Sequence, residues 1–250
     1  MTGAVQYPVF TPESAVGHRR AAAVAAASAR AAMRLLTATR VSGQENVPDR
    51  PVVFAPYHAS RLDPVTVGLA VWDLGRMPHF LAKDSLFIGP LGRLLKAMGQ
   101  IPVLRASAHA GDSLQYGKQA LEAGESVVIY PQGTLTKDPE LWPQPAKTGA
   151  ARLAIESGAP VVPIAHWGLD PVLPVRGKVP RPRPLSTVRV SIGRPLEPPA
   201  PAVSAGHSGP HQTRRFADRI TAAIAAELAV LRETELPERF RTDLDTQENP

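Results

Sequence analysis

Apolar residues follow two patterns that alternate along the chain. Short apolar runs bounded by turn residues are typical of buried strands, and they occur at residues 52–57, within 79–87, and at 100–105, 126–130 and 159–168. Stretches with helical spacing lie between the later runs, at residues 90–99, 111–123 and 147–158. The alternation predicts an α/β fold with a mostly parallel central sheet covered by helices.

The pattern changes after residue 170. Prolines crowd residues 171–186, which we expect to form a long loop, and residues 187–193 alternate like an edge strand. Residues 198–212 are expected to be a mobile linker, and residues 241–250 a tail. Between them, apolar side chains at helical spacing predict a last amphipathic helix, striped by Phe216, Ile220, Ile224, Leu228 and Leu231.

Residues 13–37 predict a cationic amphipathic helix. Four arginines fall within about one 100° sector of the helical wheel, opposite a face made mostly of alanine; they are Arg19, Arg20, Arg30 and Arg34. The helix could anchor the protein on anionic lipid, or it could dock on its own domain. The sequence leaves both alternatives open.

Composition narrows the functional classes. The chain has 250 residues, a formal net charge of +6 and no cysteine, so thiol catalysis and thiolate metal sites are excluded. Its basic residues favour an anionic partner, but aromatics make up only 5% and do not alternate with them, which argues against nucleic acid. No apolar segment is long enough for a membrane span, and we expect no metal and no cofactor.

His58 and Asp63 are the strongest candidates for chemistry. On one continuous helix they would point roughly 140° apart, so they could not meet. Instead, Asp63 suits a helix N-cap followed by Pro64, and a loop from the preceding strand could fold His58 back to it. A carboxylate that orients a histidine makes a general base, and the sequence offers no side-chain nucleophile, which fits one-step acyl transfer.

The same spacing occurs a second time, at His79 and Asp84. His79 falls in a predicted strand, where side chains five positions apart point to opposite faces. We therefore interpret the second pair as accidental.

Four ordered segments resemble the 1-acylglycerol-3-phosphate acyltransferase family of lysophospholipid acyltransferases, over roughly residues 38 to 195. They are YHASRLD, then FLAKDSLFIGPLGRLLKAMGQIPVLR, then YPQGTLT followed by KTGAARLA, and finally VVPIAHWG. The resemblance implies a glycerolipid acyltransferase-like fold with His58 and Asp63 as the catalytic dyad. It also implies acceptor contacts in the third segment, at Gln132, Gly133 and Thr134, and an acyl site around Val162 and Pro163.

Two positions depart from the family's third segment, which generally reads Phe-Pro-Glu-Gly-Thr-Arg. Gln132 replaces the glutamate, and Leu135 replaces the arginine, which removes a bidentate phosphate ligand. The remaining candidates for binding an anionic acceptor are Lys83, Arg105, Lys137 and Lys147.

The sequence thus predicts a peripheral enzyme at the cytoplasmic face of an anionic membrane. It would move a fatty acyl group from acyl-CoA or acyl carrier protein to a lysophospholipid, with 1-acylglycerol-3-phosphate as the first acceptor expected. The alternatives are another lysolipid or a glycolipid acceptor, or a catalytically weakened lipid-binding homologue. We divide the chain into an amphipathic helical segment (1–40), a catalytic domain (41–196), and a linker with a C-terminal helix and tail (197–250).

Overall fold

One seven-stranded sheet forms the centre of the computed structural model. The structure describes residues 7–104, 111–175, 177–200 and 209–245, and for residues 242–245 it describes the backbone alone. The strand order is β1-β7-β6-β2-β5-β3-β4, and every neighbouring pair is parallel except β6 and β7. The strands are β1 (Ala38–Ser42), β2 (Val53–Pro56), β3 (Pro78–Lys83), β4 (Ile101–Val103), β5 (Ser126–Val128), β6 (Val161–Trp167) and β7 (Thr187–Ile192). The α/β fold with a mostly parallel sheet is confirmed.

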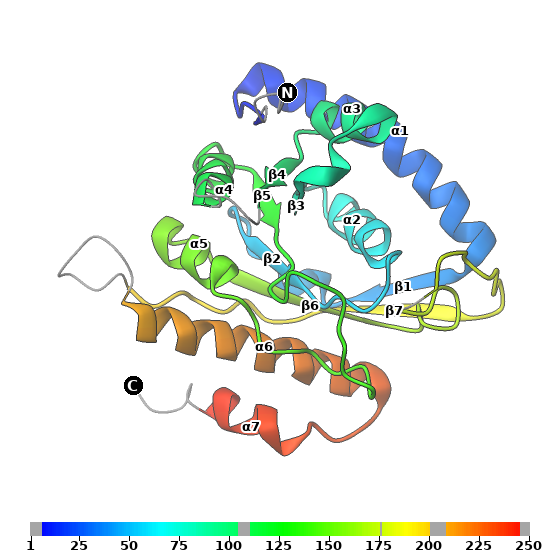
Figure 1. Cartoon of the computed structure of the whole chain (residues 1–250), viewed down its shortest axis with the longest axis vertical. Helices are drawn as coiled ribbons and strands as arrows, with labels where there is room; N and C mark the ends of the chain where they lie inside the picture. Colours follow the sequence, from blue (N-terminus) through cyan, green and yellow to red (C-terminus); the bar gives the residue numbers. More distant parts are fainter. Residues whose placement is uncertain (1–6, 105–110, 176, 201–208, 246–250) are drawn as a thin grey trace.

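Helices cover both faces of this sheet (Figure 1). They are α1 (Pro12–Leu36), α2 (Asp63–Asp73), α3 (Gly89–Ala97), α4 (Asp112–Glu122), α5 (Gly149–Ser157), α6 (Pro210–Arg232) and α7 (Glu238–Asp245). Two short 3₁₀ helices, η1 (Gln44–Asn46) and η2 (Asp84–Leu86), lie in the connections. None of the helices in the described ranges has both the length and the apolar character that crossing a bilayer requires.

The core is split by the sheet into two layers, because successive side chains of a strand point to opposite faces. On β2, Val53 and Ala55 join a cluster with the buried residues of α4, α5 and α6. Val52 and Phe54 pack on the other side, against α2 and Met33 of α1. The sheet therefore holds the strand ends fixed between two packed layers.

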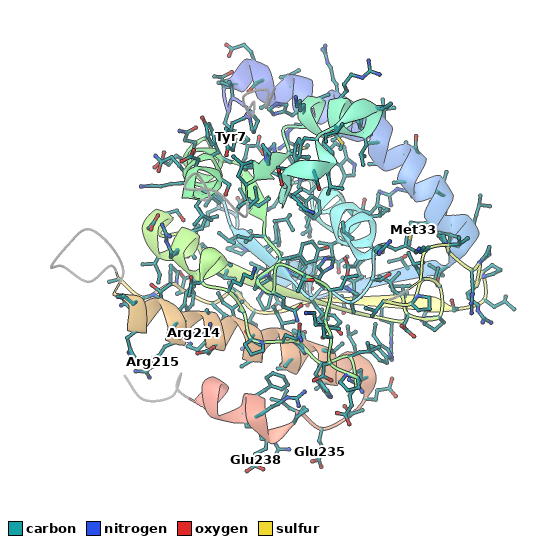
Figure 2. The ribbon with its side chains drawn as sticks, viewed as in Figure 1. Tyr7, Met33, Arg214, Arg215, Glu235 and Glu238 are labelled. Atoms are coloured by element: carbon teal, nitrogen blue, oxygen red, sulfur yellow. The ribbon has the colours of Figure 1, made fainter. Side chains whose placement is uncertain are left out.

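Helix α1 docks on the domain. Its first turn has a reciprocal capping box, in which Thr11 and Ser14 each accept from the other's backbone N–H. Arg30 pairs with Asp73 of α2 at 3.0 Å, and Arg19 donates to the carbonyl of Gly75. Met33 is buried at the C-terminal end of the helix (Figure 2). Two of the four arginines proposed to meet lipid are thus engaged within the molecule.

Three expectations from the sequence are wrong. Strand β7 is not at the edge, because β1, a mostly exposed strand with no apolar run, pairs in parallel with it and takes the edge. Residues 241–245 belong to α7, which packs against α6 through Phe240, so the tail prediction fails there. The linker prediction extends too far, since α6 already begins at Pro210; residues 201–208 lie outside the described residues.

Candidate active site

The loop between β2 and α2 is folded around the carboxylate of Asp63. Asp63 is the first residue of α2, with Leu62 in the N-cap position, so the predicted N-cap is wrong by one residue. Its carboxylate points back into the loop, where it accepts hydrogen bonds from the backbone N–H groups of Ala59 at 2.8 Å and Ser60 at 2.9 Å. Ser60 in turn donates its hydroxyl to the carbonyl of Leu173. The loop is therefore held by Asp63 on one side and by Leu173 on the other.

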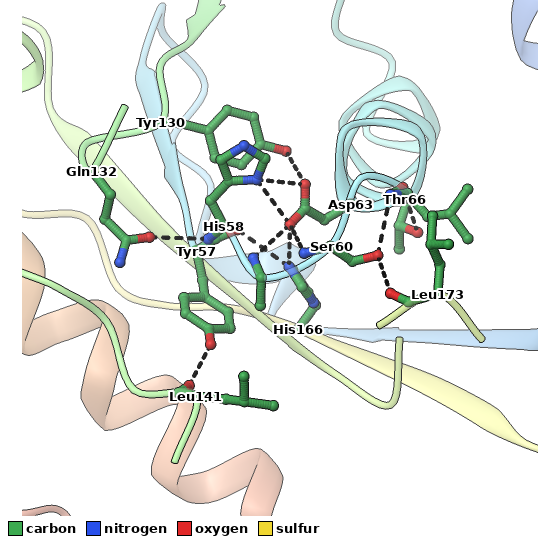
Figure 3. Close-up of polar contacts among 12 residues, drawn as sticks. Tyr57, His58, Ser60, Asp63, Thr66, Tyr130, Gln132, Leu141, His166 and Leu173 are labelled. Atoms are coloured by element: carbon green, nitrogen blue, oxygen red, sulfur yellow. Dashed lines mark hydrogen bonds and ion pairs between the residues drawn. The ribbon is translucent and has the colours of Figure 1, made fainter. Parts of the chain in front are cut away.

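This loop brings His58 to Asp63, as the sequence predicts (Figure 3). Nδ1 of His58 lies 2.9 Å from Oδ1 and 3.1 Å from Oδ2 of the aspartate. Because an ionised carboxylate only accepts, Nδ1 carries the hydrogen and Nε2 keeps its lone pair. The Asp63 side chain is fully buried, whereas 19% of the His58 side chain is exposed. The geometry is that of an oriented base with one accessible nitrogen.

Two further side chains reach Asp63 that spacing along the sequence does not indicate. Nε2 of His166, in β6, lies 3.2 Å from Oδ2, and the hydroxyl of Tyr130, just after β5, donates to Oδ1 at 3.2 Å. Burial alone would raise the pKa of Asp63, but hydrogen bonds from His166 and His58, together with their charges, outweigh burial and lower that pKa to about 2. Asp63 is thus held as an anion.

The YPQGTLT segment holds the backbone of His58. Oε1 of Gln132 accepts the N–H of His58 at 3.2 Å, and the N–H of Thr136 donates to the carbonyl of His58 at 2.8 Å. Gln132 is buried, with only 5% of its surface exposed. Both peptide groups that flank the imidazole are therefore fixed by this segment.

A cleft of about 1010 Å³ opens beside His58, between α1, α2, α3 and the carboxyl ends of β3 and β5. This volume is at the upper end of the range for small-molecule sites, and ligands of open α/β sheets bind at the carboxyl ends of the strands. Most lining residues are apolar. Of the residues proposed from the sequence, the lining includes His58, Lys83, Gly133, Thr134 and Lys147.

The other proposed residues do not reach the described lining of this cleft. Lys137 directly follows the YPQGTLT segment and is exposed, outside the lining. Val162 is fully buried in the core beside β2, and Pro163 pairs with Ala55 within the sheet. Arg105 lies outside the described residues. The cations that the structure places at the cleft are therefore Lys83 and Lys147.

The second histidine with the same spacing has a different environment. Nδ1 of His79 contacts the carbonyl of Gly99 at 2.9 Å, and its Nε2 lies 3.8 Å from Glu125. Burial lowers the pKa of His79 to about 4, with smaller contributions from His18 and Arg19. His79 is thus packed against His18 of α1, and the contacts of its ring nitrogens are with Gly99 and Glu125.

Although two histidines flank Asp63, the described residues include no group of three side chains that could hold a metal ion. Both imidazoles direct a nitrogen at the carboxylate oxygens, so they share no open point where a cation could sit.

Comparison with known proteins decides the family. The family described as Acyltransferase matches residues 38–167, more than half of the chain, and this range includes His58, Asp63, Tyr130 and His166. The chain belongs to the acyltransferase family. The resemblance seen in the four ordered segments is confirmed.

Similar proteins within the acyltransferase family are named as 1-acyl-sn-glycerol-3-phosphate acyltransferases. A chloroplastic 1-acyl-sn-glycerol-3-phosphate acyltransferase of Brassica napus is 34% identical over 140 residues, covering 54% of this chain and 39% of the relative. A 1-acyl-sn-glycerol-3-phosphate acyltransferase of Pseudomonas aeruginosa is 26% identical, covering 76% of this chain and 68% of the relative. The chain thus spans about two fifths of the length of the Brassica relative.

The fold is also found in a solved acyltransferase. The crystal structure of the 1-acyl-sn-glycerophosphate acyltransferase PlsC from Thermotoga maritima superposes with a TM-score of 0.60 at 20% identity. The match covers 88% of this chain and 78% of PlsC. The predicted glycerolipid acyltransferase-like fold is confirmed.

Proposed function

We propose that this acyltransferase moves a fatty acyl group from a thioester, acyl-CoA or acyl carrier protein, to the free hydroxyl of a lysophospholipid. The observation that carries the proposal is the 2.9 Å contact between His58 and buried Asp63 at the wall of a large, mainly apolar cleft. The imidazole supplies the base, and the apolar walls suit a fatty chain.

His58 would act as the general base in a single transfer step. Its Nε2 accepts the proton of the acceptor hydroxyl while that oxygen attacks the thioester carbonyl carbon. The bond from the carbonyl carbon to sulfur then breaks, the thiolate leaves, and His58 returns the proton to the sulfur. Asp63 keeps the imidazole in the Nδ1–H tautomer and stabilises the imidazolium that forms during the step.

The first acceptor we propose is 1-acylglycerol-3-phosphate, the substrate in the names of the relatives. Leu135 lines the cleft where the family generally has arginine, so the phosphate would have to be met by Lys83 and Lys147. Nζ of Lys147 lies next to Gly133, 3.4 Å from the position that a Cβ atom would take at residue 133. The alternative acceptor is a lysolipid without a phosphomonoester, or a glycolipid, which the loss of arginine favours.

A thiol-release assay tests this proposal. The full chain would be given a long-chain acyl-CoA and a panel of lysolipids with phosphomonoester, phosphodiester and sugar head groups, and the acylated product identified by mass spectrometry. Transfer to lysophosphatidic acid above the other acceptors supports the first acceptor, and preference for another supports the alternative. Acyl-chain binding without transfer to any of them would indicate the weakened lipid-binding homologue.

We further propose that the protein binds anionic membranes through an apolar ridge next to the cleft. The ridge is formed by Leu86, Ile88, Leu91 and Leu94, which are between 41% and 75% exposed. Leu86 and Leu94 also line the cleft, so the ridge is continuous with its apolar interior. Exposed Arg93 and Lys96 on α3 add the positive charge that favours anionic lipid.

Flotation with vesicles of phosphatidylglycerol and phosphatidylcholine tests the ridge. Replacing Ile88 and Leu91 by serine should abolish most binding. Val230→Ser should not, because Val230 is 70% exposed, close to the 75% of Ile88, but lies on α6, across the sheet from the ridge (Figure 1). Unchanged flotation of the double variant would contradict the proposal.

A further inference from the structure

The carboxylate of Asp63 receives more donors than the His58 pairing requires. Oδ1 accepts from His58 and Tyr130, while Oδ2 accepts from the N–H groups of Ala59 and Ser60 and lies 3.2 Å from Nε2 of His166. A carboxylate offers about four lone-pair positions, so its capacity is filled. Because the side chain is fully buried, each donor replaces water that cannot reach it.

His166 approaches Asp63 from β6, the strand next to β2, and is only 2% exposed. Its Nε2 lies 3.2 Å from both the carbonyl of Tyr57 and Oδ2 of Asp63. Both partners are acceptors, so Nε2 must carry a hydrogen. The position of His166 therefore fixes its tautomer and directs a donor to the aspartate.

Tyr130 contacts both members of the pair. Its hydroxyl donates to Oδ1 of Asp63 at 3.2 Å, and its ring lies against the His58 ring, with centroids 4.2 Å apart and planes 34° from parallel. Burial raises the pKa of Tyr130 well above 10, and Asp63 adds to this, so the hydroxyl stays protonated and remains a donor. The family's third segment generally has phenylalanine at this place, which keeps the ring contact but has no donor.

We propose that Tyr130 and His166 are positioning residues that hold the Asp63 carboxylate for His58, an inference that rests on the proposed function. With both donors present, the carboxylate cannot rotate away from Nδ1, and its charge is spread over several hydrogen bonds. Other ionisable groups near the pair are Tyr57, whose hydroxyl donates to Leu141, and Lys83 and Lys147, which line the same cleft.

Kinetics with acyl-CoA and the preferred lysolipid are the first test. Tyr130→Phe and His166→Leu should each lower kcat about tenfold, with KM for both substrates within about twofold, because ground-state binding does not involve Asp63. His166→Gln, which can place an amide donor near the former Nε2, should recover most of kcat. In Tyr130→Phe the acid limb of the pH profile of kcat/KM should move to higher pH by about half a unit. With one donor fewer, the Asp63 carboxylate stabilises the protonated form of His58 more strongly.

Tyr57→Phe is the matched control. It also removes a buried tyrosine hydroxyl, but one bonded to the carbonyl of Leu141 and not to Asp63, so it should lose stability without moving the acid limb. If Tyr130→Phe and His166→Leu keep kcat within about twofold of the unmodified protein, or if the acid limb of Tyr130→Phe does not move, the positioning role is overturned.

Stability provides a readout that does not need activity. Asp63 stabilises the fold above its unfolded pKa of 3.8, and this contribution is lost as pH falls toward the folded pKa of about 2. Losing the Tyr130 donor raises the folded pKa of Asp63, so the destabilisation by Tyr130→Phe should shrink as pH falls from 4 to 2, through the folded pKa, while that of Tyr57→Phe stays constant. A pH-independent difference for both variants overturns the inference. Absence of transfer by the unmodified protein would overturn the proposed function alone.

Discussion

Nδ1 of His58 lies 2.9 Å from Oδ1 of Asp63, although the two residues belong to different elements and would diverge on one helix. The contact exists because the backbone N–H groups of Ala59 and Ser60 donate hydrogen bonds to the carboxylate and hold it against the loop that carries His58. The pair is therefore a product of loop closure, and its strength depends on Asp63 remaining an anion.

Replacing Asp63 by asparagine should damage both rate and stability. The amide keeps the size of the side chain but loses the charge that orients and stabilises the imidazolium, so kcat should fall by about 10² or more. Removing a buried charge that several donors share should also cost about 3 kcal/mol of unfolding free energy. Urea unfolding and initial rates at pH 7.5 measure the two effects. Asp84→Asn, at the same spacing from His79, is the control and should change neither greatly.

Acceptor choice should depend on Lys147 and not on Lys137. Lys147 lines the cleft beside Gly133, whereas Lys137, which directly follows the YPQGTLT segment, lies outside the described lining. Lys147→Met should lower kcat/KM for lysophosphatidic acid roughly tenfold relative to an uncharged lysolipid, because one charge-assisted contact is lost. Lys137→Met should leave the ratio unchanged. Equal ratios for both variants would indicate that Lys147 does not meet the phosphate.

The alanine-rich face of α1 should limit the acyl chain. Ala25 lines the cleft, whereas Ala27 is exposed and absent from its lining. Phenylalanine at position 25 would fill part of the apolar space, so KM for a long-chain acyl-CoA should rise roughly tenfold while a short-chain donor is little affected. Ala27→Phe should behave like the unmodified protein with both donors. If chain length makes no difference to Ala25→Phe, the fatty chain lies elsewhere.

Acidification should weaken the fold well before Asp63 titrates. The pKa of His79 is about 4 in the folded protein, because of burial, and ordinarily 6.5 when unfolded. As pH falls below 6.5 the unfolded chain binds the proton first, so His79 should reduce the unfolding free energy by about 3 kcal/mol between pH 6.5 and 4. The pKa of neighbouring His18 is also lowered by burial, which acts in the same direction.

Urea unfolding across this pH range, with His79→Gln and exposed His211→Gln compared, measures the contribution of His79. The His79 variant should have a flatter dependence on pH than the His211 variant. Parallel curves would show that His79 is not responsible.

Much of this fold could be predicted from the sequence because apolar runs report burial directly. The strands β2, β5 and β6 are nearly all buried, and each was expected from its apolar run. Strand β1 was missed because it is almost fully exposed and its pairing with β7 is set by residues about 150 positions away. Local pattern carries no information about such a partner.

The candidate site shows the same limit. His58 and Asp63 are five residues apart, so their pairing could be inferred from loop and helix signals. His166 lies 103 residues from Asp63, and Tyr130 lies 67 residues from it, so only the sheet order brings them together. Gln132 was expected to orient the acceptor, which stays a prediction; its side-chain oxygen accepts the backbone N–H of His58, a contact no motif spacing reveals.

The most direct test of the account is the rate of acyl transfer by His58→Ala. The assay would follow thiol release from a long-chain acyl-CoA with the best acceptor of the lysolipid panel, and circular dichroism would verify that the variant is folded. If His58 is the general base, kcat should fall by about 10² to 10⁴ relative to the unmodified protein, with little change in stability, since the side chain is partly exposed. Transfer by folded His58→Ala at a rate close to that of the unmodified protein would contradict the account.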